Sequence, residues 1–247
     1  MSMKYLLRKF SYSSKISRKS LQLCLSRSIS TEKKLENQQY CFDQVKKQDF
    51  EGYLVGLLYP KHIRTAYFAI KAFNIEIATI KDQIPNNSNN IARIRFQFWR
   101  DILHEIQEKK KIAPHINQPV ALELLDIIQE HNLTTRWFER SLEARWDYFS
   151  TLSLHFSYLS RLADITNNGV YEDYNGLEDY AELAHSSLNY LMLELLGLRT
   201  DTSLQYAASH LGVSTGITTL IRSHPYHASL VSFSFLWIEA GVYLSVS

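Results

Sequence analysis

Hydrophobic residues recur every three or four positions along most of the chain, which is the spacing of one face of an α-helix. The clearest run covers residues 60–84, where the repeating positions are Ile63, Tyr67, Ile70, Phe73, Ile77, Ile80 and Ile84. Similar runs predict helices over residues 91–111, 117–131, 134–148, 177–196 and 202–222. Because no segment alternates apolar and polar residues as a strand does, we predict an all-α fold.

Several residues mark the ends of these helices. Pro60 suits a helix start, and Pro85 with the polar run after it predicts the end of the first long helix. Thr134 or Thr135 is the expected N-cap of the helix over 134–148. Gly197 is expected as a C-cap, and Pro225 as the residue that stops the last helix.

The composition agrees with one helical domain. Of 247 residues, 45% are hydrophobic and 21% are charged, and only eight are Gly and five are Pro. Scarce Gly and Pro favour long uninterrupted helices, and we expect a single domain over residues 38–247. Residues 230–246 are apolar but short and contain Glu239, so they predict a buried or interfacial helix rather than a membrane span.

The N-terminus has a different character. Residues 1–31 hold seven Lys or Arg, nine Ser and no acid, which is typical of a mitochondrial transit peptide. We therefore expect residues 1–35 to be an unstructured import signal; a basic arm that binds nucleic acid or membrane is the alternative. The remaining chain has 20 basic and 25 acidic residues, a net charge of −5 that argues against nucleic-acid binding.

Ten short segments, in this order, carry a family resemblance. They are Tyr40-Cys41, 49–54, 57–60, 72–76, 95–99, 118–121, 177–182, 186–188, 207–212 and 222–227. On these segments the chain resembles the squalene/phytoene synthase family, and most closely its mitochondrial complex I assembly factor 6 branch. The resemblance implies an isoprenoid-synthase-like helical bundle.

Catalytic members of that family join two prenyl diphosphates, and two aspartate-rich motifs on facing helices hold the magnesium ions. Carboxylates are required because Mg²⁺ prefers oxygen ligands and must stabilise the departing diphosphate. In this chain the first motif falls on Ala78, Thr79 and Asp82, which retain one acid of three. The second falls on Arg222 and Ser223, and no acid occurs between residues 202 and 238.

These departures predict a non-catalytic protein, with no catalytic residue, no metal site and no cofactor. Three arginines remain as candidates for binding an anion or lipid head group, Arg64, Arg95 and Arg222; ordinary surface arginines are the alternative. His210, His224 and His227 lack the spacing of a metal site, and the Ser186-Ser187 pair lacks an evident base. Neither Cys24 nor Cys41 suggests a disulfide or a metal site.

Two segments depart from the closer branch. Residues 150–170 look like an insertion, and the pattern after Ala228 no longer matches. We expect either a bundle truncated at the C-terminus or a diverged terminus, with apolar surface left uncovered.

The resemblance implies a non-catalytic assembly factor for respiratory complex I. Its expected partners are complex I subunits or assembly intermediates, with peripheral contact to the inner membrane on the matrix side and no nucleic acid. The alternative is a prenyltransferase, or a protein that binds a prenyl diphosphate or lipid, in isoprenoid metabolism.

Overall fold

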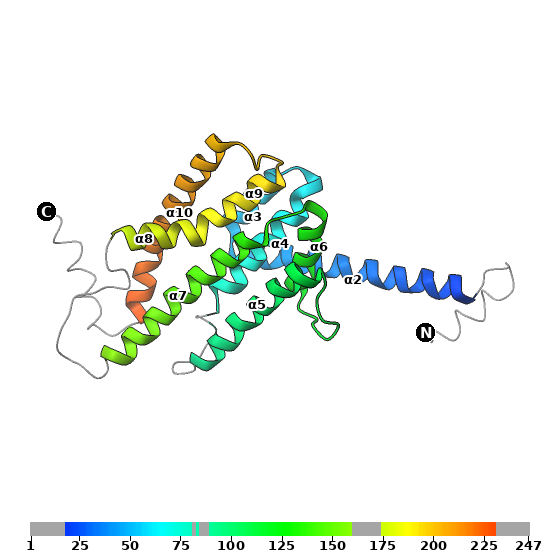
Figure 1. Cartoon of the computed structure of the whole chain (residues 1–247), viewed down its shortest axis with the longest axis horizontal. Helices are drawn as coiled ribbons and strands as arrows, with labels where there is room; N and C mark the ends of the chain where they lie inside the picture. Colours follow the sequence, from blue (N-terminus) through cyan, green and yellow to red (C-terminus); the bar gives the residue numbers. More distant parts are fainter. Residues whose placement is uncertain (1–17, 81–82, 84–88, 160–173, 231–247) are drawn as a thin grey trace.

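A computed structural model describes residues 18–80, 83, 89–159 and 174–230. Its elements, all helical within these ranges, form an elongated bundle (Figure 1). In chain order they are α2 (Arg18–Gln48), α3 (Phe50–Leu58), α4 (Lys61–Ala78), α5 (Asn89–Lys109), α6 (Pro119–His131), α7 (Thr135–Leu159), α8 (Tyr174–Ala181), η2 (Glu182–Ser186), α9 (Ser187–Leu195) and α10 (Thr202–Leu230). The predicted all-α fold is confirmed.

Helix α4 lies at the centre of the bundle. It contacts α2, α3, α6, α7 and α9, and most of its side chains are buried. Phe73 has no exposed surface, and its ring packs edge to face against Trp99 and Phe138 at 5.3 Å from each. The recurring apolar side chains of α4 therefore form the centre of the core, where burial of large side chains stabilises the fold.

The N-terminal part of α2 extends beyond the bundle (Figure 1). Residues 18–35 were expected to be unstructured, but they are helical here because no Gly or Pro interrupts the chain from Arg18 to Gln48. Contact with the body also begins before residue 38. Lys33 donates to Asn117 at 2.9 Å and Lys34 pairs with Asp126 at 3.1 Å.

Most predicted helix boundaries agree with the structure. The helices expected over 91–111 and 117–131 are α5 and α6, and Gly197 has the positive φ of +73° expected at a C-cap. Helix α7 begins at Thr135, directly after Thr134, as expected, and the Thr134 hydroxyl donates to Glu194 at 2.7 Å.

Three predicted boundaries are wrong. Helix α4 ends at Ala78, well before Pro85, where the Thr79 hydroxyl donates back to the Ile75 carbonyl at 2.9 Å. The helix expected over 177–196 is divided by the π-helical turn η2. Helix α10 continues through Pro225 to Leu230, although proline has no N–H to donate to the preceding turn.

The predicted insertion over 150–170 is partly described: α7 continues to Leu159, and residues 160–173 lie outside the described residues. Residues 1–17 and the apolar segment 231–247 also lie outside them. Within the described ranges, every helix is too short or too polar to cross a membrane.

Candidate functional site

The candidate site lies where α4, α7, η2 and the start of α3 meet. On α4, Lys71, Asn74 and Ala78 are spaced three and four residues apart, so they share the face that leads to the first motif position. Ala78 is the last residue of α4 and Thr79 is its C-cap, while Asp82 lies outside the described residues. The residues that precede the motif on this face are therefore a lysine and an amide.

The Lys71 ammonium pairs with the Asp49 carboxylate at 2.8 Å. Asp49 is the N-cap of α3 and also accepts a hydrogen bond from the Gly52 N–H at 2.8 Å. Burial disfavours the charged carboxylate, but Lys71 and the Gly52 N–H outweigh burial and lower the pKa of Asp49. This carboxylate is therefore already engaged by a cation and a helix terminus.

Arg145 of α7 is 8% exposed and crosses the interior toward α4. Its guanidinium donates to Asn74 Oδ1 at 2.6 Å, to Ser141 Oγ at 2.7 Å and to the Ser141 carbonyl at 3.3 Å. Burial lowers the pKa of Arg145, against the effect of Tyr180, which raises it. Among the described residues no acid forms a salt bridge with Arg145, so neutral oxygens hold this buried charge.

His185 of η2 completes the basic cluster. Its burial, together with the charges of Arg145 and Lys71, lowers the pKa of the imidazole from 6.5 to about 3. The ring is therefore neutral at physiological pH, and two fixed positive charges lie within electrostatic reach of it. We call Lys71, Arg145 and His185, with their partners Asn74 and Ser141, the basic network.

Helix α10 packs directly against η2 next to this network. A Cβ atom added at Gly212 would lie 2.5 Å from Ser186 Cα, and one at Gly216 would lie 2.7 Å from Ala181 Cβ. Such close approach is possible only for glycine. The backbones themselves therefore fill this part of the space between the helices.

The second motif position is linked to α3. Arg222 donates to both carboxylate oxygens of Glu51, at 3.0 and 3.1 Å, and both side chains are largely exposed. Ser223 lies within α10, but its side chain is outside the described part of the chain. Asp49 and Glu51, at the start of α3, thus hold Lys71 of α4 and Arg222 of α10.

The three candidate arginines do not share a partner. Arg64 donates to the carbonyls of Leu57, at 2.7 Å, and Tyr59, at 2.9 Å, and so closes the end of α3. Arg95 donates to Gln83 and lines a separate pocket of about 390 Å³ with Glu76 and Phe98. The structure brings only Arg222 near the basic network, since its charge contributes to the lowered pKa of Asp49.

The two serine candidates have ordinary structural partners, and the side chains of His224 and His227 lie outside the described residues. Ser186 Oγ donates to the Ser209 carbonyl at 3.0 Å, and Ser187 Oγ donates to the Leu183 carbonyl at 2.7 Å. His210 is exposed on α10. In the parts of the chain that the structure describes, no three His, Cys, Asp or Glu side chains are grouped as metal ligands.

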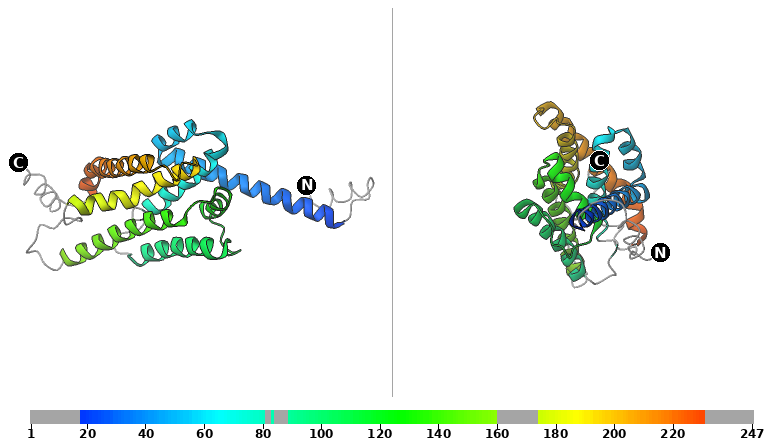
Figure 2. Two further views of the ribbon diagram at one scale, coloured as in Figure 1. Left: turned by 45° about the horizontal axis from the view of Figure 1, so that its top comes forward. Right: turned by 90° about the vertical axis from the view of Figure 1, so that its right-hand side faces the viewer.

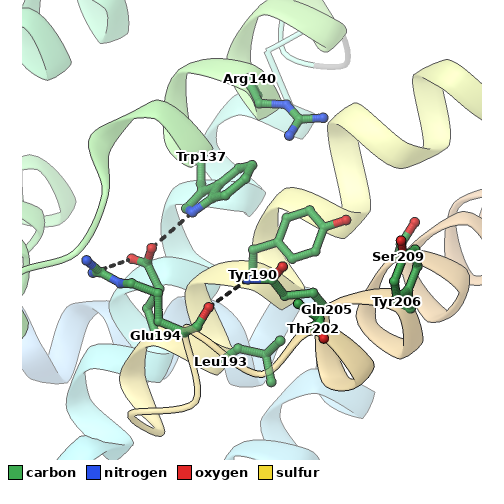
Figure 3. A pocket seen from close by; sticks show the side chains of 10 residues that line it. Trp137, Arg140, Tyr190, Leu193, Glu194, Thr202, Gln205, Tyr206 and Ser209 are labelled. Carbon is green, nitrogen blue, oxygen red and sulfur yellow. Dashed lines mark hydrogen bonds and ion pairs between the residues drawn. The ribbon is translucent and has the colours of Figure 1, made fainter.

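A pocket of about 370 Å³ near the N-terminal end of α7 was not predicted from the sequence (Figure 3). Trp137 and Tyr190 form one wall, with ring centroids 4.7 Å apart, and the Arg140 guanidinium lies 5.0 Å from the Trp137 ring. Beside them, Glu182 accepts hydrogen bonds from Tyr190 Oη at 2.7 Å and Ser209 Oγ at 2.8 Å.

Glu194 organises the floor of this pocket, and its side chain is only 4% exposed. It accepts hydrogen bonds from the Thr134 N–H at 2.8 Å, the Thr134 hydroxyl at 2.7 Å and Trp137 Nε1 at 3.1 Å. It also pairs with Arg199 at 3.3 Å. The sequence offered one signal for this burial, since Glu194 is the single acid within the apolar run of residues 191–196.

Glu123 of α6 is a second buried acid that sequence analysis missed. It is 1% exposed, and its Oε2 atom has no hydrogen-bond partner. Burial raises its pKa to about 7. Burial and the nearby Glu123 also raise the pKa of Cys41 to about 12, so this thiol stays protonated.

Comparison with known proteins adds the family. The squalene/phytoene synthase family profile matches residues 45–233. The bovine protein named NADH dehydrogenase (ubiquinone) complex I, assembly factor 6 is 38% identical over 190 residues, which are 77% of this chain and 50% of that protein. The human protein of the same name is 37% identical with the same coverage, and the Drosophila melanogaster homolog is 32% identical over 80% of this chain and 53% of its own length. The chain thus spans about half the length of these curated relatives.

Solved structures share the fold. A squalene synthase HpnC from Alicyclobacillus acidocaldarius superposes with a TM-score of 0.58 at 15% identity, covering 79% of this chain and 64% of that protein. A dehydrosqualene synthase superposes with a TM-score of 0.56 at 19% identity, covering 80% of this chain and 61% of that enzyme. The predicted isoprenoid-synthase-like bundle is confirmed.

Proposed function

Because the chain belongs to the squalene/phytoene synthase family and its curated relatives carry the name of a complex I assembly factor, we propose that it assists assembly of mitochondrial complex I. The identity of 35–38% to four mammalian relatives, over three quarters of this chain, carries the proposal. The solved synthases are much less similar and support the fold alone.

We propose further that the protein acts without catalysis. The support is electrostatic: Lys71 and Arg145 supply positive charge, and the carboxylate of Asp49 is already paired. A magnesium ion is stabilised by carboxylate oxygens and repelled by neighbouring cations. The first motif has Ala78 and Thr79 where acids are expected. Neither Ala78 nor Thr79 offers a carboxylate that could bind the metal ion needed to ionise a prenyl diphosphate.

Its proposed location is the matrix side of the inner membrane, with complex I subunits or assembly intermediates as partners. The basic, acid-free composition of residues 1–31 supports import, and we retain residues 1–35 as the proposed import signal. Helical structure over residues 18–35 agrees with such a role, because import signals are amphipathic helices when bound.

Deletion of the gene tests the proposal. Native gel electrophoresis should show a loss of assembled complex I, while the other respiratory complexes and the isoprenoid products are unchanged. Expression of the same chain should restore complex I, and the chain without residues 1–35 should not, since it would stay outside mitochondria. Normal complex I in the deletion strain contradicts the proposal.

A binding measurement separates the alternative function. The purified chain is titrated calorimetrically with geranylgeranyl diphosphate, with and without Mg²⁺. We expect no magnesium-dependent binding. Binding that requires Mg²⁺, or conversion of the substrate to a condensed product, would instead support a prenyltransferase.

A further inference from the structure

Helix α3 presents large apolar side chains to solvent. Five of its nine residues are exposed hydrophobics: Phe50, Leu54, Val55, Leu57 and Leu58. Leu58 alone has 85% of its surface exposed. At 100° per residue, Phe50, Leu54, Leu57 and Leu58 lie on one side of the helix, with Val55 at its margin. We call these five residues the α3 apolar face.

The inner side of α3 carries glycine. Gly52 and Gly56 are its buried residues, and a Cβ at Gly56 would lie 2.6 Å from Tyr67 and 2.7 Å from Phe68. A surface helix normally buries its large apolar residues and exposes polar ones. Helix α3 instead exposes five large apolar residues, with Glu51 as the charged residue among them, and its packing against α4 requires small residues.

The orientation of α3 is fixed by contacts at both ends. Asp49 caps its N-terminus, and the Tyr67 hydroxyl donates to the Gly52 carbonyl at 2.7 Å. At the other end, the Arg64 guanidinium donates to the carbonyls of Leu57 and Tyr59. Tyr53 packs edge to face against Phe42 at 5.2 Å. These contacts fix α3 at the periphery of the bundle (Figure 2), with its apolar face exposed.

Exposed basic residues flank this face. Lys46 and Lys47 end α2 just before it, and Lys61 and His62 begin α4 just after it. The Lys46 ammonium lies 5.7 Å from the ring centroid of Tyr53, on α3 itself. The acids at the start of α3 are neutralised, since Asp49 pairs with Lys71 and Glu51 pairs with Arg222. The chain therefore carries exposed basic residues on both sides of α3 in sequence.

We infer that the α3 apolar face inserts into the interfacial layer of an anionic phospholipid bilayer. Exposed Leu, Phe and Val side chains on a helix that lysines precede and follow in the chain match the composition of helices that lie in a membrane surface. Each lysine near an anionic surface adds attraction, and each inserted aliphatic side chain adds hydrophobic free energy. A protein partner would have to accept a protruding apolar helix and also supply acidic groups on both sides of it.

This inference deepens the proposed location and rests on it only for the identity of the membrane. Vesicle binding is measured with pure components, whereas complex I assembly is measured in cells. A failure of either proposal is therefore recognisable without the other.

A site-specific fluorescence experiment tests the inference in the full chain. Cys24 is changed to Ser, and an environment-sensitive NBD label is placed at Leu58→Cys or, as a control, at Lys111→Cys, an exposed site after α5. Vesicles of 30% phosphatidylglycerol in phosphatidylcholine should shift the label at position 58 to the blue and leave the label at 111 unchanged. Binding of vesicles with no shift at position 58 would overturn the inference, because another segment would then make the contact.

Flotation of unlabelled variants measures the two contributions. Leu54→Ser with Leu58→Ser should weaken binding about tenfold or more, since two inserted side chains are lost. Lys47→Glu with Lys61→Glu should weaken binding to anionic vesicles about tenfold and leave phosphatidylcholine vesicles unaffected. Matched controls are Ile94→Ser with Leu211→Ser, both exposed, and Lys110→Glu with Lys111→Glu.

Equal binding by all four variants would exclude the α3 apolar face as the membrane contact. Light scattering without vesicles tests whether a second copy of the chain binds the α3 apolar face instead. If the wild-type chain forms dimers that Leu54→Ser with Leu58→Ser abolishes, and vesicles do not bind, the face contacts a second copy and the inference is wrong.

Discussion

Two buried charges beside α7 are accommodated in different ways. In the middle of α7, Arg145 is held by the neutral oxygens of Asn74 and Ser141. Near the start of α7, Glu194 of α9 accepts three hydrogen bonds and pairs with Arg199. Glu194 thus ties the ends of three segments together, whereas Arg145 fills a space with positive charge.

The two arrangements differ in what the buried charge costs the folded protein. A fully bonded buried acid is costly to remove because its donors are left unsatisfied. A buried cation without an acid is costly to keep, because its desolvation is not repaid by a counter-charge. Packing alone therefore does not require the buried charge of the basic network, which neutral oxygens hold.

Removal of Glu194 should have the largest effect. Glu194→Ala leaves the Thr134 N–H, the Trp137 N–H and the Arg199 guanidinium without their acceptor, so we expect a loss of about 3 kcal/mol in unfolding free energy. Urea denaturation measures it, and Glu108→Ala on the exposed surface of α5 is the control. A loss no larger than that of the control would show that Glu194 has no structural role.

Glu123 extends the comparison to an acid with an unsatisfied oxygen. Its pKa of about 7 in the folded state lies above the ordinary value of 4.5. The folded protein therefore binds this proton more tightly than the unfolded chain does, and stability falls as the pH rises from 4.5 to 7. Glu123→Gln should match the wild type at pH 4 and be more stable by about 2 kcal/mol at pH 8.

Urea denaturation at both pH values checks this expectation, with Glu108→Gln on the exposed surface of α5 as control. An equal difference between variant and wild type at the two pH values would contradict the pKa shift.

Arg145→Met should have a smaller effect, within about 1 kcal/mol of the wild type. Loss of the hydrogen bonds to Asn74 and Ser141 is offset by removal of a desolvated charge. The same variant should raise the pKa of His185, because one of its cationic neighbours is gone. NMR titration of the imidazole measures the pKa, and an unchanged value would mean that the two groups do not interact.

The exposed pair of Arg222 and Glu51 should matter least. Both side chains are more than half exposed, and such pairs contribute at most about 1 kcal/mol. Arg222→Ala and Glu51→Ala should each lower the melting temperature only slightly, and the double variant should lose no more than either single one. An effect as large as that of Glu194→Ala would show that α3 and α10 depend on this contact.

Sequence periodicity was sufficient to predict the core helices α4, α5 and α6, because a helix with one buried face has apolar residues every three or four positions. It was insufficient for η2, a wider turn that lies close to Gly212 and Gly216 of α10. The motif positions predicted the loss of acids but not the basic network. Arg145 meets Asn74 across 71 residues of sequence, and no local pattern encodes that contact.

The same limit applies to the candidate anion site. Arg64, Arg95 and Arg222 were grouped by residue type, and their separation became evident only from their partners. Glu194 was missed because its donors come from a different helix. The exposed apolar side of α3 could have been predicted from the sequence, since Gly52 and Gly56, four residues apart within an apolar run, indicate which side of the helix packs closely.

Affinity capture from mitochondria tests the proposed role most directly. The full chain is tagged at its C-terminus, and an unrelated matrix protein with the same tag serves as the control. We predict that complex I subunits or early assembly intermediates are enriched over the control by quantitative mass spectrometry. Recovery of the tagged protein from the matrix without any complex I subunit would contradict the proposed function.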